Sequence, residues 1–261
     1  MLGAIVGDIV GSVYERWPIK TTDFPLFSQN CRPTDDTILT AAVASVLMET
    51  HSPSRLSAAY VTAFHEFFEI YPDAGYGMTY FEWAKNRIRE PYGSWGNGSA
   101  MRVSPIAYVF DTEEEVLREA ARSSAVTHDH SDALAGAQAT ALAGFMARKG
   151  KSKEAIRSKV ANLFGYDLDT SVDEIRTGYG FDVSSRGTVP ASLLAFFDGS
   201  SYEECIRLAI SLGGDSDTLA AITGGIAEAA YGVPVDIAEK ALSICDTRIN
   251  EIVEEFVAAY Y

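Results

Sequence analysis

Two short segments of the chain concentrate carboxylate and hydroxyl side chains, the groups that bind hard metal ions. They are Thr34-Asp35-Asp36-Thr37 and Gly213-Gly214-Asp215-Ser216-Asp217-Thr218, and each stands where a helix is expected to begin. Asp and Thr are preferred helix caps, and acids there complement the helix dipole, so capping alone is one interpretation of either segment. Capping needs only one side chain, however, and each segment offers two carboxylates and at least one hydroxyl.

If the two segments converge in the fold, their carboxylates could bind metal ions. Four of them crowded together would repel by about 4 kcal/mol for each pair 4 Å apart at an effective dielectric of 20. Divalent cations remove that cost. Oxygen ligands without Cys or imidazole favour Mg²⁺ or Mn²⁺ over zinc. Because so many ligands are available, we expect two such ions as cofactors.

A glycine-rich segment from Gly93 to Arg102 predicts a loop that surrounds an anion. Glycines let backbone N–H groups approach a ligand closely, and a helix expected to begin near Ser99 would add its positive end. Trp95 could stack on a base or a sugar. The alternative is a tight loop with Asn97-Gly98 as its turn. The segment is neither a Walker A motif nor a Rossmann fingerprint, because no Gly-Lys-Ser/Thr follows the glycines and no strand precedes them.

A fourth polar segment, Thr127-His128-Asp129-His130-Ser131-Asp132, carries two of the four histidines. A zinc pair on one helix needs His at i and i+4, so a spacing of two disfavours a zinc protease. The segment predicts either a capped helix start or a histidine that presents a hydrogen bond to a ligand.

Helical patterns dominate the elements that must position these groups, and they predict one all-α domain over residues 1–261. Gly3, Gly7 and Gly11 are spaced by four, which places a smooth stripe on one helix face and allows close approach of another backbone. Asp8 and Glu15 are seven apart and would share a face. Predicted helices cover residues 2–14, 36–48, 52–70 (from Ser52-Pro53), 112–123, 131–147, 151–164, 201–213, 217–231 and 236–259. A further helix is expected to start at Thr79, which forms a capping box with Glu82. Residues 90–98 are expected to form a loop, and residues 166–189 have a mixed pattern.

Composition narrows the functional class. The net charge is −15, with 36 Asp plus Glu against 21 Lys plus Arg. Such a field repels polyphosphate, which argues against general nucleic-acid binding but not against a small nucleotide in a local pocket. No apolar run is long enough to span a membrane, and no basic region precedes the first apolar stretch, so we expect neither a membrane anchor nor a signal peptide. The three distant cysteines predict buried thiols in a reducing cytoplasm.

Together these segments resemble the ADP-ribosylglycohydrolase family, to which the dinitrogenase reductase-activating glycohydrolase belongs. Residues 3–15 are similar to its opening helix and metal-site glutamate, and the two acidic segments are similar to its metal motifs. Trp95-Gly96-Asn97-Gly98-Ser99-Ala100-Met101-Arg102 is similar to its substrate loop, and Thr127-His128 to its substrate-facing histidine. The resemblance spans residues 3–232 in the family's order.

The apolar residues of the predicted helix 236–259 fit core packing better than an oligomer seam, so we expect a monomer. The resemblance implies a compact helical bundle with a central dimetal cleft. It also implies hydrolysis of the bond between the distal ribose of ADP-ribose and an acceptor: a protein side chain such as Arg or Ser, or a small ADP-ribosyl conjugate. The implied metal ligands are Glu15, Thr34, Asp35, Asp36, Asp215, Asp217 and Thr218. The implied substrate-binding residues are Gly93, Ser94, Trp95, Gly96, Asn97, Gly98 and His128, with Gly178–Phe181 and Thr188–Pro190 near the adenosine.

Two questions stay open at this point. The general base of the hydrolysis is either Glu15 or Asp36. The alternatives to a hydrolase are a non-catalytic ADP-ribose-binding or structural protein of the same fold, and a different Mg²⁺ enzyme such as a phosphoesterase. The chain is shorter than many family members, and Ser131 and Trp95 replace a proline and another aromatic residue common there. These departures bear on acceptor choice rather than on the metal ligands.

Overall fold

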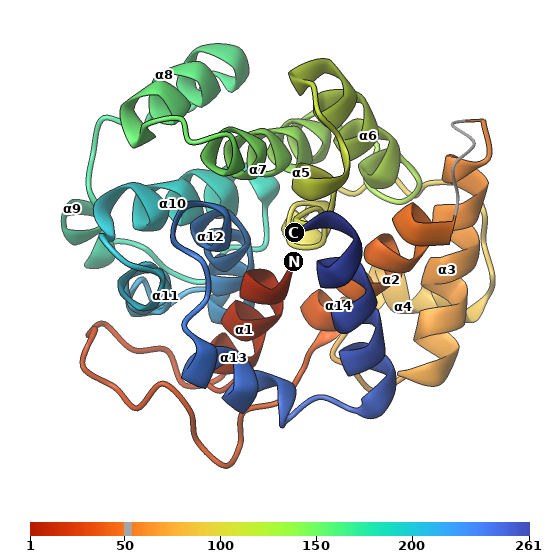
Figure 1. The fold of residues 1–261 in the computed structure, drawn as a ribbon, viewed down its shortest axis with the longest axis horizontal. Helices are drawn as coiled ribbons and strands as arrows, with labels where there is room; N and C mark the ends of the chain where they lie inside the picture. The colour runs from red at the N-terminus through yellow and green to blue at the C-terminus, as the bar shows by residue number, and fades with distance from the viewer. Residues whose placement is uncertain (50–53) are drawn as a thin grey trace.

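The computed structural model describes residues 1–49 and 54–261, which form helices joined by loops (Figure 1). The helices are α1 (Leu2–Gly11), α2 (Asp35–Glu49), α3 (Leu56–Ile70), α4 (Met78–Lys85), the short 3-10 helix η1 (Asn97–Ser99), α5 (Ile106–Val109), α6 (Glu113–Ala125), α7 (Ser131–Arg148), α8 (Lys153–Phe164), α9 (Val172–Arg176), α10 (Ser185–Asp198), α11 (Tyr202–Ser211), α12 (Ser216–Tyr231), α13 (Val235–Leu242) and α14 (Thr247–Tyr260). One isolated bridge pairs Gly96 with Ser184. The all-α prediction is confirmed.

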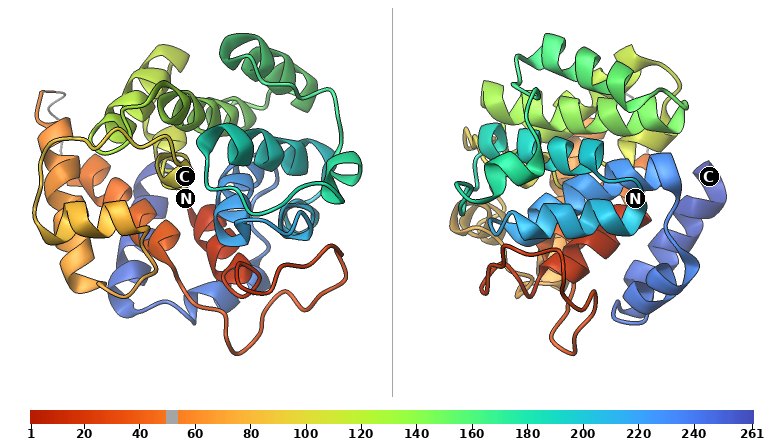
Figure 2. Two further views of the ribbon diagram at one scale, coloured as in Figure 1. Left: turned by 180° about the vertical axis from the view of Figure 1, so that it is seen from behind. Right: turned by 90° about the vertical axis from the view of Figure 1, so that its left-hand side faces the viewer.

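Helix α12 lies at the centre of the fold and packs against α1, α7, α10 and α11 (Figures 1 and 2). Its residues 216–228 are all buried, so it is enclosed on every side. A helix without an exposed face needs no amphipathic pattern, and this accounts for its Ala- and Gly-rich sequence. The hydrophobic core extends from this helix to all the larger helices around it.

The glycine stripe of α1 forms the tightest contact in the fold, against α12. A Cβ placed on Gly7 would lie 2.1 Å from the carbonyl oxygen of Ala220, and one on Gly3 would lie 2.4 Å from that of Gly224. A Cβ on Gly11 would meet the carbonyl oxygen of Ser216 at 2.5 Å. The two backbones therefore touch along a glycine seam, as the spacing of four predicts.

Several predicted helix boundaries hold because a capping side chain sets them. Thr112 and Ser201 accept hydrogen bonds from the backbone N–H groups of Glu115 and Glu204. Helix α7 begins at Ser131 as expected. The predicted start of the third helix at Ser52-Pro53 lies outside the described residues, and this helix ends at Ile70, just before the Tyr71-Pro72 boundary.

Other predicted boundaries are wrong for local reasons. Helix α1 ends at Gly11 because residues 12–16 form turns, and Glu15 lies beyond it. Helix α4 begins at Met78 with Gly77 at its N-cap, so Thr79 lies inside the helix and cannot cap it. The predicted helix 236–259 is two helices, because Asp246 caps α14 by accepting from the Ile249 N–H.

Helix α10 was not predicted, because Pro190 and the polar residues before it look like a loop. Ser184 starts this helix by accepting from the N–H of Gly187.

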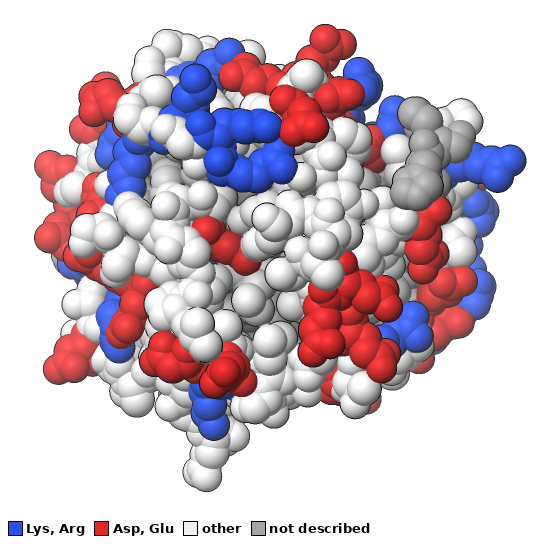
Figure 3. All heavy atoms as spheres, in the orientation of Figure 1, with Lys and Arg blue, Asp and Glu red and all other residues white. Residues whose placement is uncertain are grey.

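None of the helices in residues 1–49 and 54–261 is long and apolar enough to cross a membrane. The face in Figure 3 carries a dense group of acidic side chains over α14, where Glu251, Glu254 and Glu255 are exposed.

Candidate active site

A cleft of about 530 Å³ is lined by every predicted metal ligand, by the predicted substrate-binding residues 93–98 and by His128. Its lining includes Glu15, Thr34, Asp35, Asp36, Gly93, Ser94, Trp95, Gly96, Asn97, Gly98, His128, Asp215, Asp217 and Thr218. The two acidic segments stand at the N-terminal ends of α2 and α12. Helix α1 packs against both of these helices and brings the two ends together. The expected convergence of the two segments is therefore confirmed.

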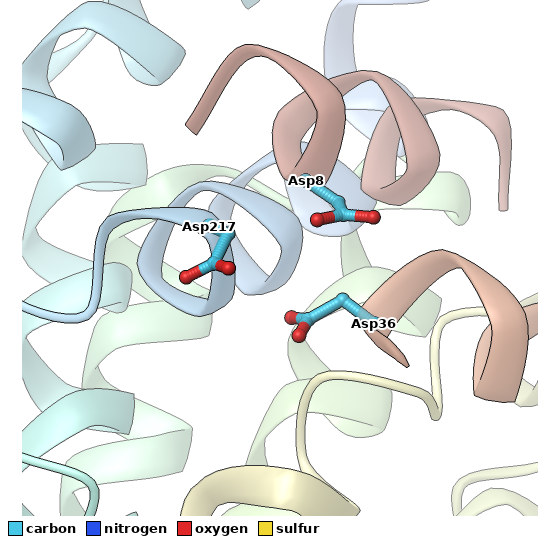
Figure 4. A group of neighbouring side chains, drawn as sticks. All are labelled: Asp8, Asp36 and Asp217. Carbon is cyan, nitrogen blue, oxygen red and sulfur yellow. The ribbon is translucent and has the colours of Figure 1, made fainter. Parts of the chain in front are cut away.

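Three aspartates from three helices meet at this cleft: Asp36 and Asp217 line its floor, and Asp8 is fully buried beside them. Asp8 of α1, Asp36 of α2 and Asp217 of α12 point toward one another, and one carboxylate oxygen from each lies within 4.8 Å of the others (Figure 4). A second group with the same spacing contains Glu15, Asp215 and Asp217. Asp217 belongs to both groups. The arrangement thus offers two adjacent oxygen-only sites with one shared carboxylate.

The donor set fits divalent cations. Asp36 Oδ1 is buried and has no hydrogen-bond partner within the described part of the chain, although the same carboxylate accepts from Thr218 Oγ1 at 3.3 Å through Oδ2. A buried oxygen without a donor is costly unless a cation reaches it. Carboxylate and hydroxyl oxygens are ligands that Mg²⁺ and Mn²⁺ prefer.

Asp8 is the residue that the sequence analysis missed in this role. It is fully buried, and it accepts from the N–H of Thr34 at 2.9 Å and from the N–H of Thr37 at 3.1 Å. The hydroxyls of both threonines also donate to it. Asp8 therefore caps α2 from another helix. An acid inside the glycine-striped apolar segment 2–14 was the available signal.

These contacts contradict the interpretation that the acidic segments serve only as caps. Asp8 accepts from the N–H groups of Thr34 and Thr37, and Thr34 Oγ1 accepts from that of Asp36 at 3.3 Å, so these N–H groups are capped without the side chains of Asp35 and Asp36. Asp215 stands at the N-cap position of α12, but its side chain accepts no capping hydrogen bond. It accepts instead from Asn97 Nδ2 at 2.7 Å.

Burial and mutual repulsion set the protonation of the acidic cluster. Burial raises the pKa of Asp8 and of Asp215, and it raises that of Asp217 well above the ordinary value of an aspartate. Burial, with the nearby charges of Asp8 and Asp215, raises the pKa of Asp35 to about 8. Such a cluster carries its full negative charge near neutral pH only with compensating positive charge.

The glycine-rich loop takes a different form from the one expected. The 3-10 helix η1 occupies residues 97–99 and no α-helix begins at Ser99, so the predicted helix dipole is absent there. The N–H of Asn97 donates to the carbonyl of Val183 at 2.9 Å, and that of Ser185 donates to the carbonyl of Trp95 at 3.0 Å. The loop is therefore fastened to residues 183–185. Asn97 Nδ2 also donates to Thr188 Oγ1 at 3.1 Å.

His128 lies behind this loop and is 5% exposed. Its Nδ1 is 2.8 Å from Thr127 Oγ1, and its ring meets Tyr92 edge to face. A Cβ on Gly98 would lie 3.0 Å from His128 Nε2, so a residue with a side chain at position 98 would crowd the imidazole ring. Burial, and then the charge of Arg102, lowers the pKa of His128 well below its usual value, and the ring is neutral at pH 7.

The rim of the cleft is apolar. Met78, Trp95 and Phe181 line it with 81%, 52% and 63% of their surface exposed. Trp95 was predicted here, whereas Met78 was not. Of the segment 178–181 only Phe181 lines the cleft, and Thr188–Pro190 lies in α10 behind Asn97.

Comparisons with known proteins identify a family and several relatives of this chain. A sequence model of the family described as ADP-ribosylglycohydrolase matches residues 1–261. ADP-ribosylhydrolase ARH3 of Mus musculus is 26% identical over 89% of this chain and 83% of its own length. ADP-ribosylarginine hydrolase Tri1 of Pseudomonas putida is 33% identical over 53% of this chain and 39% of its own. A solved structure titled ADP-ribosylglycohydrolase-related protein complex superposes with a TM-score of 0.67, at 26% identity, over 99% of this chain and 96% of that one.

Proposed function

Because this chain belongs to the ADP-ribosylglycohydrolase family, we propose that it hydrolyses the glycosidic bond that joins ADP-ribose to an acceptor. The observation that carries the proposal is the pair of carboxylate groups that share Asp217 at the floor of the cleft. The rim and the glycine-rich loop leave room above them for a ligand with aromatic and anionic parts.

Two divalent cations, Mg²⁺ or Mn²⁺, fit the acidic floor. Glu15, Thr34, Asp35, Asp36, Asp215, Asp217 and Thr218 would hold them, with Asp8 joining the buried group. When bound, such ions neutralise the carboxylates and supply a positive field that orients ribose hydroxyls and acidifies water.

The protein's own residues supply the remaining chemistry. Cleavage at C1 of the distal ribose passes through an oxocarbenium-like state. Glu15 is partly exposed at the edge of the cleft, where water reaches it, whereas Asp36 is buried beneath. Glu15 is therefore the preferred general base, and Asp36 is the alternative. Asn97 and the loop around it bind and orient the ADP-ribose part.

The acceptor is an arginine or serine side chain, or a small ADP-ribosyl conjugate. The name of the Tri1 relative supports the arginine linkage. The net charge of −15 favours encounter with basic substrates.

The test measures release of ADP-ribose from Arg-linked, Ser-linked and nucleic-acid-linked substrates, with Mg²⁺, with Mn²⁺ and with EDTA. We expect metal-dependent release from at least one protein-side-chain linkage. Asp217→Asn should abolish it, and Asp236→Asn, on the exposed face of α13, should not. Metal-dependent binding of ADP-ribose without release from any substrate would contradict the hydrolase and favour a binding protein.

A further inference from the structure

A buried arginine in the lining of the cleft is linked through Thr127 to His128, which also lines the cleft. Arg102 has no exposed surface, and its guanidinium packs over the ring of Phe64 at 4.3 Å. Its Nη2 donates to the carbonyl of Ser123 at 3.0 Å and to Thr127 Oγ1 at 2.8 Å. Thr127 Oγ1 in turn lies 2.8 Å from His128 Nδ1. Arg102, Thr127 and His128 therefore form one hydrogen-bonded chain that ends in the cleft.

The direction of this chain follows from which groups can donate. A guanidinium has no acceptor, so Arg102 can only donate to Thr127 Oγ1. Thr127 has no exposed surface, and within the described residues His128 Nδ1 is the acceptor in reach of its hydroxyl hydrogen. If Nδ1 carried the proton instead, Thr127 Oγ1 would accept twice and its own hydrogen would stay unpaired in a buried place, which is unfavourable.

The opposite nitrogen of the ring faces the ligand side. His128 Nε2 adjoins Gly98, where a Cβ would meet it at 3.0 Å, and Gly96, where a Cβ would lie 3.8 Å away. Both glycines line the cleft. No hydrogen bond joins Nε2 to another protein group in residues 1–49 and 54–261, so this nitrogen is available to a ligand.

We propose that Arg102 and Thr127 are positioning residues that hold His128 in the Nε2–H tautomer, so that Nε2 donates a hydrogen bond to an oxygen of the ligand beside the glycine-rich loop. The ligand part rests on the function proposed above, whereas the tautomer part does not. The nearby charge of Arg102 also opposes the imidazolium form. A neutral hydrogen-bond donor at this place suits a ligand rich in oxygen acceptors. The acidic floor repels such oxygens, whereas His128 Nε2–H can bind one of them.

The first measurement records the ring nitrogens of His128 by ¹⁵N NMR in metal-free, uniformly labelled protein. We expect Nδ1 at the shift of an unprotonated nitrogen and Nε2 at that of a protonated one. Thr127→Val keeps the shape but removes the hydroxyl, and it should mix the two tautomers. Thr127→Ser keeps the hydroxyl and should leave the wild-type pattern. His65, which packs on Trp83, serves as the internal reference.

A wild-type spectrum with the proton on Nδ1 would overturn the proposal, and this holds even if Thr127→Val does not fold. An unchanged tautomer in folded Thr127→Val would overturn the role of Thr127.

The second measurement titrates the same proteins with ADP-ribose in the presence of Mg²⁺. We expect Thr127→Val to weaken binding by about tenfold, as loss of one well-oriented hydrogen bond does, and Thr127→Ser to stay near wild type. Equal affinity for Thr127→Val and wild type would overturn the donor role. Failure of the wild type to bind ADP-ribose would overturn the ligand part together with the proposed function, while the spectrum still decides the tautomer.

Discussion

Asn97 Nδ2 lies 2.7 Å from Asp215 Oδ2, and this hydrogen bond joins the glycine-rich loop to the start of α12. The same amide nitrogen reaches Thr188 Oγ1 of α10. Two motifs 118 residues apart in the sequence are thus one structural unit. Because a carboxamide donates where a carboxylate can only accept, the identity of residue 97 sets how Asp215 faces the cleft.

Asn97→Asp should therefore damage the site without removing a carboxylate. The new acid would face Asp215, so repulsion replaces the hydrogen bond, and a lost charge-assisted bond costs about 1.5–3 kcal/mol. That corresponds to a fall of about 10- to 150-fold in kcat/KM for ADP-ribose release. Asn162→Asp adds the same charge at an exposed place on α8 and serves as the control. An unchanged kcat/KM in Asn97→Asp would show that this bond is dispensable.

The shared carboxylate makes a distinct prediction for metal binding. Asp217→Asn should weaken binding of Mg²⁺ or Mn²⁺ at both sites, because both carboxylate groups contain Asp217. Asp36→Asn should weaken one site and spare the group of Glu15, Asp215 and Asp217. Isothermal titration calorimetry distinguishes two impaired sites from one, with Asp236→Asn as the control. Identical titrations for Asp36→Asn and Asp217→Asn would contradict the assignment of two groups.

The stability of the metal-free protein should fall as pH rises from about 4 to about 8. Burial raises the pKa of the clustered aspartates, to about 8 for Asp35, so the folded chain retains protons that the unfolded chain has released above about pH 4. Unfolding then releases protons, and the free energy of unfolding falls with pH across this window. We expect Tm in EDTA to decrease through it and Mg²⁺ to restore Tm at the upper end.

The matched measurement uses Asp217→Asn, which removes one of these protons and should show a shallower decrease of Tm with pH. A metal-free Tm that rises across the same window in the wild type, relative to this variant, would contradict the raised pKa values.

Gly7→Ala tests the glycine seam. Alanine favours a helix over glycine by about 1 kcal/mol, so propensity alone predicts a more stable protein. The added Cβ would lie 2.1 Å from the carbonyl oxygen of Ala220, however, and overpacking of this kind costs about 1–3 kcal/mol or more. We expect a lower Tm, and also weaker Mg²⁺ binding because Asp8 moves away from Asp217.

Gly178→Ala is the control for this prediction, because its Cβ would lie 3.9 Å from the nearest backbone oxygen, that of Ile175. A Gly7→Ala protein as stable as wild type would mean that α1 and α12 can separate at little cost.

The cleft was predictable from the sequence because its chemistry is local in each segment. Asp35, Asp36, Asp215 and Asp217 occur beside hydroxyls at helix starts, and the spacing of the glycines predicts the packing of α1. Asp8 was not predicted as part of the acidic floor, because its partners Thr34 and Thr37 reach it only through the tertiary fold.

The missed α10 and the divided C-terminal helix have a related cause. Pro190 hides a helix that begins five residues earlier, and Asp246 starts α14 inside a segment whose helical pattern continues without a break. Local N-caps, Ser184 and Asp246, set both boundaries, but the residue patterns around them hide these caps.

The glycine seam between α1 and α12 and the apolar rim of the cleft should tolerate substitution very differently. The acidic floor stands on helices held backbone to backbone, where almost any side chain larger than hydrogen is excluded. The residues at the mouth, Met78, Trp95 and Phe181, project outward from short or irregular segments. On the function proposed above, new acceptors could therefore be acquired by exchanging the residues at the mouth while the acidic floor is retained, which makes this architecture a favourable starting point for engineering.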